Sequence, residues 1–136
     1  MTEPIPELSL DEAWKMMADT PEAVMIDVRT TAEWNYVGQP DLASIDKQLR
    51  CVEWNTFPDG SRNPRFVEEA TAGLDPSQQL ILICRSGARS RAAAQALRAA
   101  GCTRTYNVTA GFEGELDANG HRTGGWKGAG LPWRQK

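Results

Sequence analysis

Apolar residues with helical spacing alternate with short, continuously apolar runs along this chain. Residues 9–17 and 89–100 show the helical pattern, whereas residues 23–28 and 80–84 are almost continuously apolar and predict buried strands. Because strand-like and helical segments follow one another repeatedly, the sequence predicts a three-layer α/β sandwich in which helices flank a mostly parallel sheet. In such folds the active site lies at the carboxyl ends of the strands.

Local signals mark the ends of several elements. Ser9 with Glu12, and Thr30 with Glu33, have the spacing of a capping box, so each pair predicts the start of a helix. Gly101 is suited to end the helix over residues 89–100. The other predicted elements are a strand over 49–54, a helix that starts at the Asn63 cap and stops at Gly73, and a last strand over 105–108.

The length of 136 residues predicts a single domain over residues 1–136. Residues 110–136 are rich in glycine and lack clear periodicity, which is compatible with a disordered tail. The same segment contains apolar residues such as Phe112 and Trp126, and these favour an ordered C-terminal wrap around the domain.

Composition excludes some functions and narrows the compartment. The formal net charge of -3 argues against a dedicated nucleic-acid binder, and no apolar run is long enough for a membrane span. The odd number of cysteines, the absence of CxxC spacing and the single histidine, His121, argue against a structural metal site. Without a signal-peptide pattern at the N-terminus, we expect a cytoplasmic protein with reduced thiols.

The segment that joins the strand over 80–84 to the following helix is suited to hold an anion. The unpaired N–H groups of a helix start face the centre of such a loop, and Gly87 allows the backbone to bring them together. Arg85 and Arg89 add two positive charges. These surroundings favour the thiolate of Cys84 and a persulfide anion formed on it, and we expect Ser90 to donate a hydrogen bond to the sulfur.

This setting favours a nucleophilic role for Cys84 over that of a small buried hydrophobic residue. Cys51, within a predicted strand, and Cys102, just past a helix end, are interpreted as buried structural residues. We assign no role to His121.

Several motifs resemble the single-domain rhodanese (thiosulfate sulfurtransferase-like) family. The active-site loop pattern C-R-x-G-x-[RT] is matched by Cys84, Arg85, Ser86, Gly87, Ala88 and Arg89. Weaker matches are Asp27-Val28-Arg29 with Glu33-Trp34 and Gly38, then 107–112, Trp126 and 130–133. Residues 38–48 depart from the family pattern, so we expect an altered loop here and a different acceptor preference.

The resemblance implies a five-stranded parallel sheet and a double-displacement reaction without a cofactor. Cys84 would take a sulfane sulfur from a small anionic donor such as thiosulfate and pass it to a thiol, cyanide or a protein acceptor. Residues 85–90 would form the substrate-binding loop. Asp27, Arg29 and Glu33 would support it through ion pairs, and no metal is implied.

Two alternatives remain open. One is a cysteine-based phosphatase or arsenate reductase on the same fold, although phosphatase loops have five residues between cysteine and arginine and this chain has four, Arg85 to Ala88. The other is a non-catalytic rhodanese-like binding module, against which the presence of Cys84 with both arginines argues.

Overall fold

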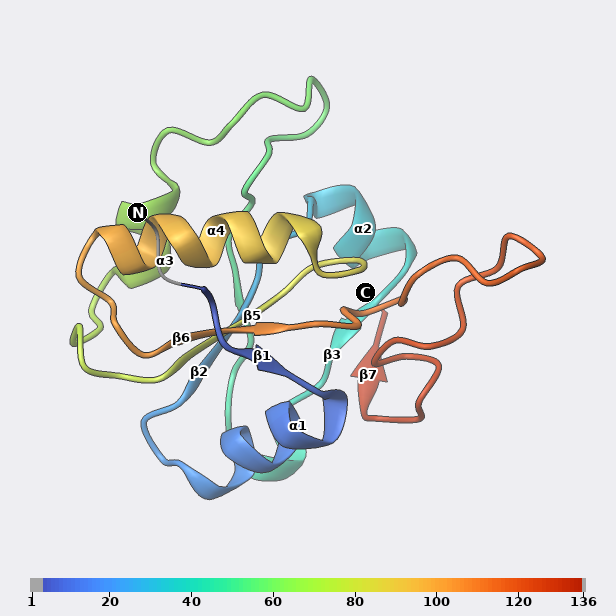
Figure 1. Cartoon of the computed structure of the whole chain (residues 1–136), viewed down its shortest axis with the longest axis horizontal. Helices are drawn as coiled ribbons and strands as arrows, with labels where there is room; N and C mark the ends of the chain where they lie inside the picture. Colours follow the sequence, from blue (N-terminus) through green and yellow to red (C-terminus); the bar gives the residue numbers. More distant parts are fainter. Residues whose placement is uncertain (1–3, 136) are drawn as a thin grey trace.

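A five-stranded parallel sheet forms the centre of the protein, in a computed structural model that describes residues 4–135 (Figure 1). Its strands follow the spatial order β1-β6-β5-β2-β4, and every neighbouring pair is parallel. The strands are β1 (Glu7–Leu8), β2 (Val24–Asp27), β4 (Arg50–Cys51), β5 (Leu80–Ile83) and β6 (Thr105–Val108). The predicted α/β fold with a mostly parallel five-stranded sheet is confirmed.

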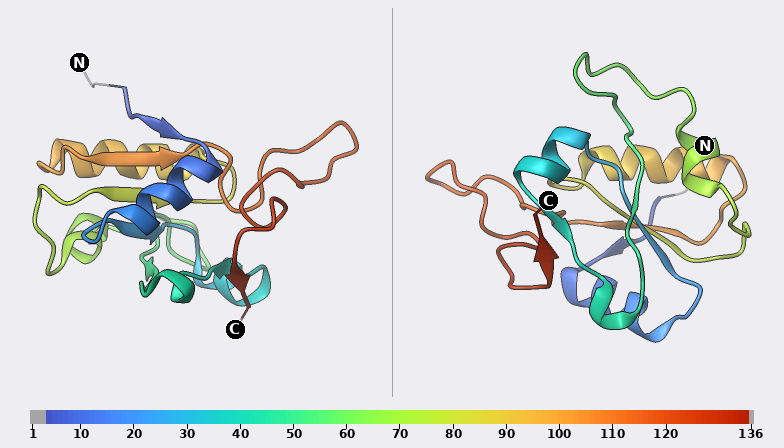
Figure 2. Two further views of the ribbon diagram at one scale, coloured as in Figure 1. Left: turned by 90° about the horizontal axis from the view of Figure 1, so that it is seen from below. Right: turned by 180° about the vertical axis from the view of Figure 1, so that it is seen from behind.

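Helices cover both faces of this sheet, which gives the three layers (Figures 1 and 2). One face carries α3 (Phe66–Thr71) and α4 (Ala88–Ala99), and the other carries α1 (Leu10–Asp19) and the short 3-10 helix η1 (Ala43–Ile45). The remaining helix, α2 (Thr31–Tyr36), lies beyond the carboxyl end of β2.

The central strand β5 is apolar at every position because both of its faces are covered. Leu80 and Leu82 belong to the core beneath α3 and α4, whereas Ile81 and Ile83 belong to the core beneath α1. All four side chains are buried. A strand buried on both faces has no solvent-facing positions, which explains its continuous apolar run.

The helix starts predicted from the two capping boxes agree with the structure. Ser9 and Glu12 form a complete capping box at α1, and Thr30 and Glu33 form another at α2. At the other end of α4, Gly101 adopts a left-handed backbone conformation, with φ of +106°.

Two predicted elements are shorter in the structure. The strand predicted over 49–54 is regular only at Arg50 and Cys51, where it forms the edge of the sheet, although the N–H groups of Val52 and Trp54 still donate to the carbonyls of Asp27 and Val28. The helix predicted to start at Asn63 begins at Phe66. The Asn63 side chain accepts a bond from the Arg65 N–H at 3.0 Å and closes a local turn, so the regular helix starts after it.

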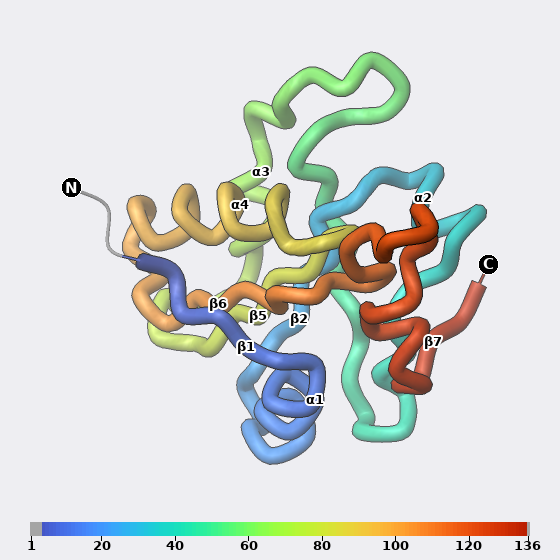
Figure 3. Tube along the Cα trace, turned by 45° about the vertical axis from the view of Figure 1, so that its right-hand side comes forward, coloured from blue at the N-terminus to red at the C-terminus, as the bar shows by residue number. Residues whose placement is uncertain are grey.

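A second, two-stranded sheet near the C-terminus escaped sequence analysis. It pairs β3 (Gln39–Pro40) with β7 (Trp133–Arg134) in antiparallel fashion. Between β6 and β7 the chain packs against the domain through buried Phe112 and Trp126. Figure 3 shows an excursion from the compact body around residues 55–62, and Figures 1 and 2 show another around residues 115–123. Within residues 4–135 no helix is long and apolar enough to cross a membrane.

Candidate active site

The loop from Cys84 to Gly87 lies at the carboxyl end of the central strand β5 and leads into α4 (Figure 1). The segment after β6 supports its backbone. The N–H of Phe112 donates to the Cys84 carbonyl at 2.7 Å, and the N–H groups of Glu113 and Gly114 donate to the Arg85 carbonyl at 3.0 and 3.1 Å. The loop is therefore fixed from both sides, by β5 and by the start of the C-terminal segment.

Two hydrogen-bond donors converge on the sulfur of Cys84. The Gly87 N–H lies 3.1 Å from Sγ, and the Ser90 hydroxyl oxygen lies 3.2 Å from it. Cys84 itself is only 1% exposed. A buried sulfur that faces two donors is suited to carry negative charge, because each donor offers a partially positive hydrogen.

Gly87 has a backbone conformation that a side chain would not tolerate. Its φ is +104°, and a Cβ atom built at this position would lie 2.4 Å from the Thr109 carbonyl oxygen. That oxygen belongs to the backbone at the end of β6 and cannot move aside easily. Glycine is therefore required to turn the Gly87 N–H toward the sulfur.

We expect Gly87→Ala to displace the loop and to slow the reaction of Cys84 with iodoacetamide, because the substitution combines a strained φ with a backbone clash. A loss of about 2 kcal/mol or more in the free energy of unfolding should accompany it, measured by urea denaturation. Gly73→Ala is the control, since its φ is similar, at +75°, but its Cβ would meet no atom within 4 Å. If both variants lost the same stability, φ alone would explain the effect.

The guanidinium of Arg89 is held by Glu33 rather than pointing alone into the loop. The two side chains form two hydrogen bonds of 2.8 and 2.9 Å and are each partly buried. The hydrogen bond with Glu33 raises the pKa of Arg89. Burial alone would raise the pKa of Glu33, but the hydrogen bond and charge of Arg89 outweigh it and lower that pKa. The pair is therefore ionised at neutral pH.

Arg85 has a different environment from Arg89. It is exposed, and it forms none of the ion pairs found among residues 4–135. The two other loop residues have small side chains: Ser86 is half-buried and Ala88 is exposed at the start of α4. Arg85 is thus the loop cation that remains available to an approaching anion.

Of the three residues predicted to support the loop, two pair with each other and the third pairs elsewhere. Asp27 and Arg29 are fully buried and joined at 2.7 Å. The Arg29 guanidinium also donates to the Gly38 carbonyl at 2.7 Å and lies 4.3 Å from the centre of the Phe112 ring. Glu33 instead binds Arg89 on the loop itself. A supporting role for these residues remains our proposal.

Sequence analysis missed two polar residues near the loop, Asn107 on β6 and Glu7 on β1. Asn107 is fully buried and contacts the Ser90 hydroxyl, while its amide nitrogen donates to Glu7 at 2.9 Å and to the Gly87 carbonyl at 3.1 Å. The signal in the sequence for Asn107 was a polar residue beside apolar Val108 within a strand predicted to be part of the sheet. A buried polar side chain needs partners, and here they include the loop.

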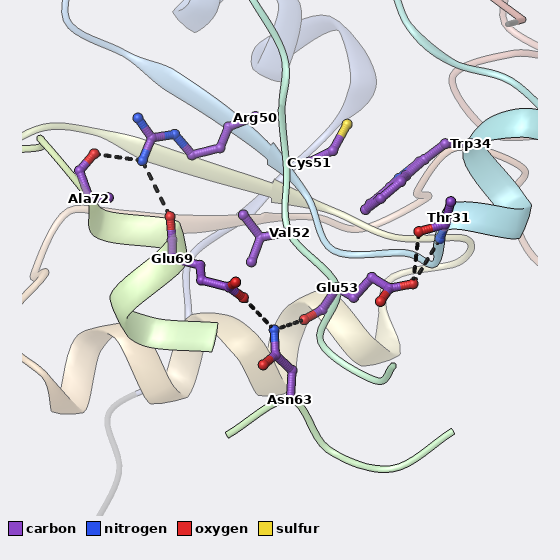
Figure 4. A pocket seen from close by; sticks show the side chains of 9 residues that line it. All are labelled: Thr31, Trp34, Arg50, Cys51, Val52, Glu53, Asn63, Glu69 and Ala72. Atoms are coloured by element: carbon purple, nitrogen blue, oxygen red, sulfur yellow. Dashed lines mark hydrogen bonds between the residues drawn. The ribbon is translucent and has the colours of Figure 1, made fainter. Parts of the chain in front are cut away.

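The interpretation of Cys51 as a buried residue is wrong. Cys51 is exposed, because it lies on the short edge strand β4, and it lines a surface pocket of about 530 Å³ between α2 and α3 (Figure 4). Cys102 is buried as expected, and burial raises the pKa of its thiol. In the part of the chain that the structure describes, no three His, Cys, Asp or Glu side chains are grouped to bind a metal.

The fold and the loop together define a class: α/β proteins with a cysteine in a short, arginine-containing loop at the end of the central strand. The family model of the rhodanese-like domain matches residues 9–117. The chain therefore belongs to the rhodanese-like domain family.

Individual relatives agree with this assignment. The crystal structure of Rv0390 from M. tuberculosis is 45% identical and superposes with a TM-score of 0.90, covering 98% of this chain and 100% of that one. An uncharacterized protein of Rickettsia rickettsii is 32% identical over 125 residues, which is 90% of this chain and 92% of the relative. The thiosulfate sulfurtransferase GlpE of Actinobacillus pleuropneumoniae is 26% identical over 132 residues, 97% of this chain and 95% of the relative.

Proposed function

We propose that this protein is a sulfurtransferase that carries a sulfane sulfur as a persulfide on Cys84. One observation carries the proposal: the Cys84 sulfur, at the end of the central strand, faces the Gly87 N–H at 3.1 Å and the Ser90 hydroxyl at 3.2 Å. Membership of the rhodanese-like family and the likeness to a thiosulfate sulfurtransferase support it.

In the first half-reaction the Cys84 thiolate attacks the outer sulfur of the donor. With thiosulfate, a bond forms between Cys84 Sγ and that sulfur, the sulfur–sulfur bond of the donor breaks, and sulfite leaves with the electron pair. The exposed guanidinium of Arg85 is suited to attract the anionic donor. The donors around the loop then stabilise the negative charge of the persulfide.

In the second half-reaction a nucleophilic acceptor attacks the outer sulfur of the persulfide. The bond between the two sulfurs breaks, and Cys84 Sγ keeps its electron pair as a thiolate. We propose a thiol or a protein cysteine as the acceptor in the cell, with cyanide as its substitute in an assay. A reducing compartment such as the cytoplasm would keep Cys84 in the thiol form that the cycle requires.

The ion pair between Arg89 and Glu33 favours sulfur over phosphate as the transferred group. Four residues separate Cys84 from Arg89, and the Arg89 guanidinium already binds the Glu33 carboxylate through two hydrogen bonds. A phosphate dianion at the loop would need that guanidinium for itself. A persulfide brings a single negative charge on one outer sulfur atom instead of a dianion with several oxygens, so it does not require that guanidinium.

The proposal is tested by incubation with thiosulfate followed by intact-protein and peptide mass spectrometry. We expect a gain of one sulfur atom, located on the peptide that contains Cys84 and removed by a thiol. Cys51→Ser is the matched control: it deletes the exposed thiol and should leave the gain unchanged. No gain with thiosulfate, polysulfide or mercaptopyruvate would leave a binding module as the better description.

A further inference from the structure

The hydroxyl of Ser90 has one proton and three acceptors within reach. These are the Cys84 sulfur and the Gly87 carbonyl, both at 3.2 Å, and Oδ1 of Asn107. The Gly87 carbonyl already receives bonds from the Asn107 amide and from the N–H of Arg91, both at 3.1 Å. The Ser90 proton therefore has two competing destinations, the sulfur of Cys84 and the side-chain oxygen of Asn107.

The orientation of Asn107 is fixed, so that its oxygen faces Ser90. Its nitrogen has two acceptors, the Glu7 carboxylate at 2.9 Å and the Gly87 carbonyl at 3.1 Å. Turning the amide over would place its oxygen against both of these acceptors and leave two bonds unmade. Glu7 is in turn held by Arg91 at 3.0 Å, and Arg91 lies on α4, as Ser90 does.

We propose that Asn107 is a positioning residue that acts on Cys84 through Ser90. Its oxygen accepts the hydrogen bond of the Ser90 hydroxyl when the sulfur is not an anion, and the hydroxyl turns to the sulfur when the sulfur becomes a thiolate. This inference rests on the proposed function. Ser90 thus alternates between two hydrogen-bond acceptors during a cycle, and Glu7 keeps the second acceptor in place.

The alternation matches the movement of charge in sulfur transfer. In the persulfide the negative charge is on the outer sulfur, so Cys84 Sγ is a weak acceptor. The Ser90 hydroxyl therefore keeps its hydrogen bond to the Asn107 oxygen. When an acceptor thiolate bonds to the outer sulfur, the sulfur–sulfur bond breaks and its electron pair remains on Sγ. Rotation of the Ser90 hydroxyl then supplies a hydrogen bond to the new thiolate. Ser90 stabilises the leaving group of the second half-reaction.

Substitutions at Ser90 or Asn107 remove none of the charged groups near Cys84, although Asn107 variants lose the hydrogen bond to Glu7. These charged groups are Arg85 in the loop, Arg89 and Arg91 from α4, Glu33 from α2, Glu7 from β1 and the Asp27–Arg29 pair from β2. A change in the behaviour of the thiol in these variants therefore reports on hydrogen bonds to the sulfur rather than on a lost charge.

The test is the pH dependence of Cys84 alkylation by iodoacetamide, followed on its own peptide by mass spectrometry. Ser90→Ala removes the donor, and we expect the midpoint of the profile to rise by about one pH unit. Asn107→Leu removes the competing acceptor, and we expect the midpoint to fall by about half a unit. The double variant should behave as Ser90→Ala, because in this proposal the effect of Asn107 on the sulfur passes through the Ser90 hydroxyl.

Shifts in the same direction for the two single variants would overturn the proposal, as would an effect of Asn107→Leu that persists in the Ser90→Ala background. If the leucine does not fit the buried site, Asn107→Val provides the same comparison with a smaller side chain. Thr109→Val is the control, since the Thr109 side chain is exposed and donates to the same Glu7 carboxylate at 2.9 Å.

A single-turnover experiment adds the kinetic prediction. Transfer of sulfur from the loaded persulfide to a thiol should slow by about tenfold in Ser90→Ala, whereas loading from thiosulfate, at a pH above the midpoint, should not slow. Equal slowing of both steps would contradict a leaving-group role. Alkylation needs no sulfur transfer, so failure of the proposed function and failure of this inference give different results.

Discussion

Replacing Cys84 with serine is expected to lower turnover with thiosulfate and cyanide by at least about 10³-fold, because the variant loses the nucleophile of the first half-reaction and the leaving group of the second. The serine hydroxyl stays protonated near neutral pH and forms no persulfide. The replacement is nearly isosteric, and its position next to the Gly87 N–H and the Ser90 hydroxyl favours a hydroxyl as an acceptor. The fold should therefore survive, and the thiocyanate formed in the assay measures the loss.

Two cysteine variants separate this effect from general thiol chemistry. Cys51→Ser removes the exposed thiol and Cys102→Ala removes the other buried one. Both should keep the rate of thiocyanate formation within about twofold of the parent protein, since neither thiol faces the loop donors. Substantial activity in Cys84→Ser, together with loss of activity in Cys51→Ser, would identify Cys51 on the edge strand as the sulfur carrier instead.

Replacing Arg29 with methionine is expected to cost about 3–5 kcal/mol in the free energy of unfolding, because it leaves the Asp27 carboxylate buried without its cation. Both side chains of the pair are 0% exposed. Arg29 also donates to the Gly38 carbonyl, and it contacts the ring of Phe112, whose N–H binds the Cys84 carbonyl. Urea denaturation measures the change.

An exposed ion pair and a double variant provide the controls. Arg65→Met breaks a pair with Glu68 of 3.7 Å between side chains that are 72% and 74% exposed, and it should have little effect. Asp27→Asn combined with Arg29→Met removes both charges and should recover part of the stability. A double variant less stable than Arg29→Met alone would show that the unpaired charge is not the main cost.

The elements that sequence analysis identified are those whose cause is local. Strand β5 is apolar because it is buried on both faces, and α1 and α2 begin at capping boxes contained within four residues. The loop after β5 was visible because its glycine and arginines are consecutive with Cys84 in the chain. Such features can be predicted without knowing which distant segments of the chain they contact.

What was missed depends on partners far apart in the sequence. Sequence alone did not reveal that the Arg89 charge meets Glu33, or that Asn107 connects Glu7 with Ser90. The exposed position of Cys51 likewise follows from the place of β4 at the sheet edge, which the strand order determines. Local patterns predicted the loop that contains Cys84, whereas the side chains that surround it are brought there by tertiary contacts.

The hydrogen bond from the Phe112 N–H to the Cys84 carbonyl also bears on the order of events during synthesis. A ribosome releases the chain from its N-terminus, so the loop emerges before β6 and before the segment that fixes its backbone. Asn107, which faces Ser90, arrives equally late. A nascent chain that ends before residue 112 has the thiol but not its surroundings. The surroundings that we propose for the sulfur carrier are thus complete only after residue 112 has emerged.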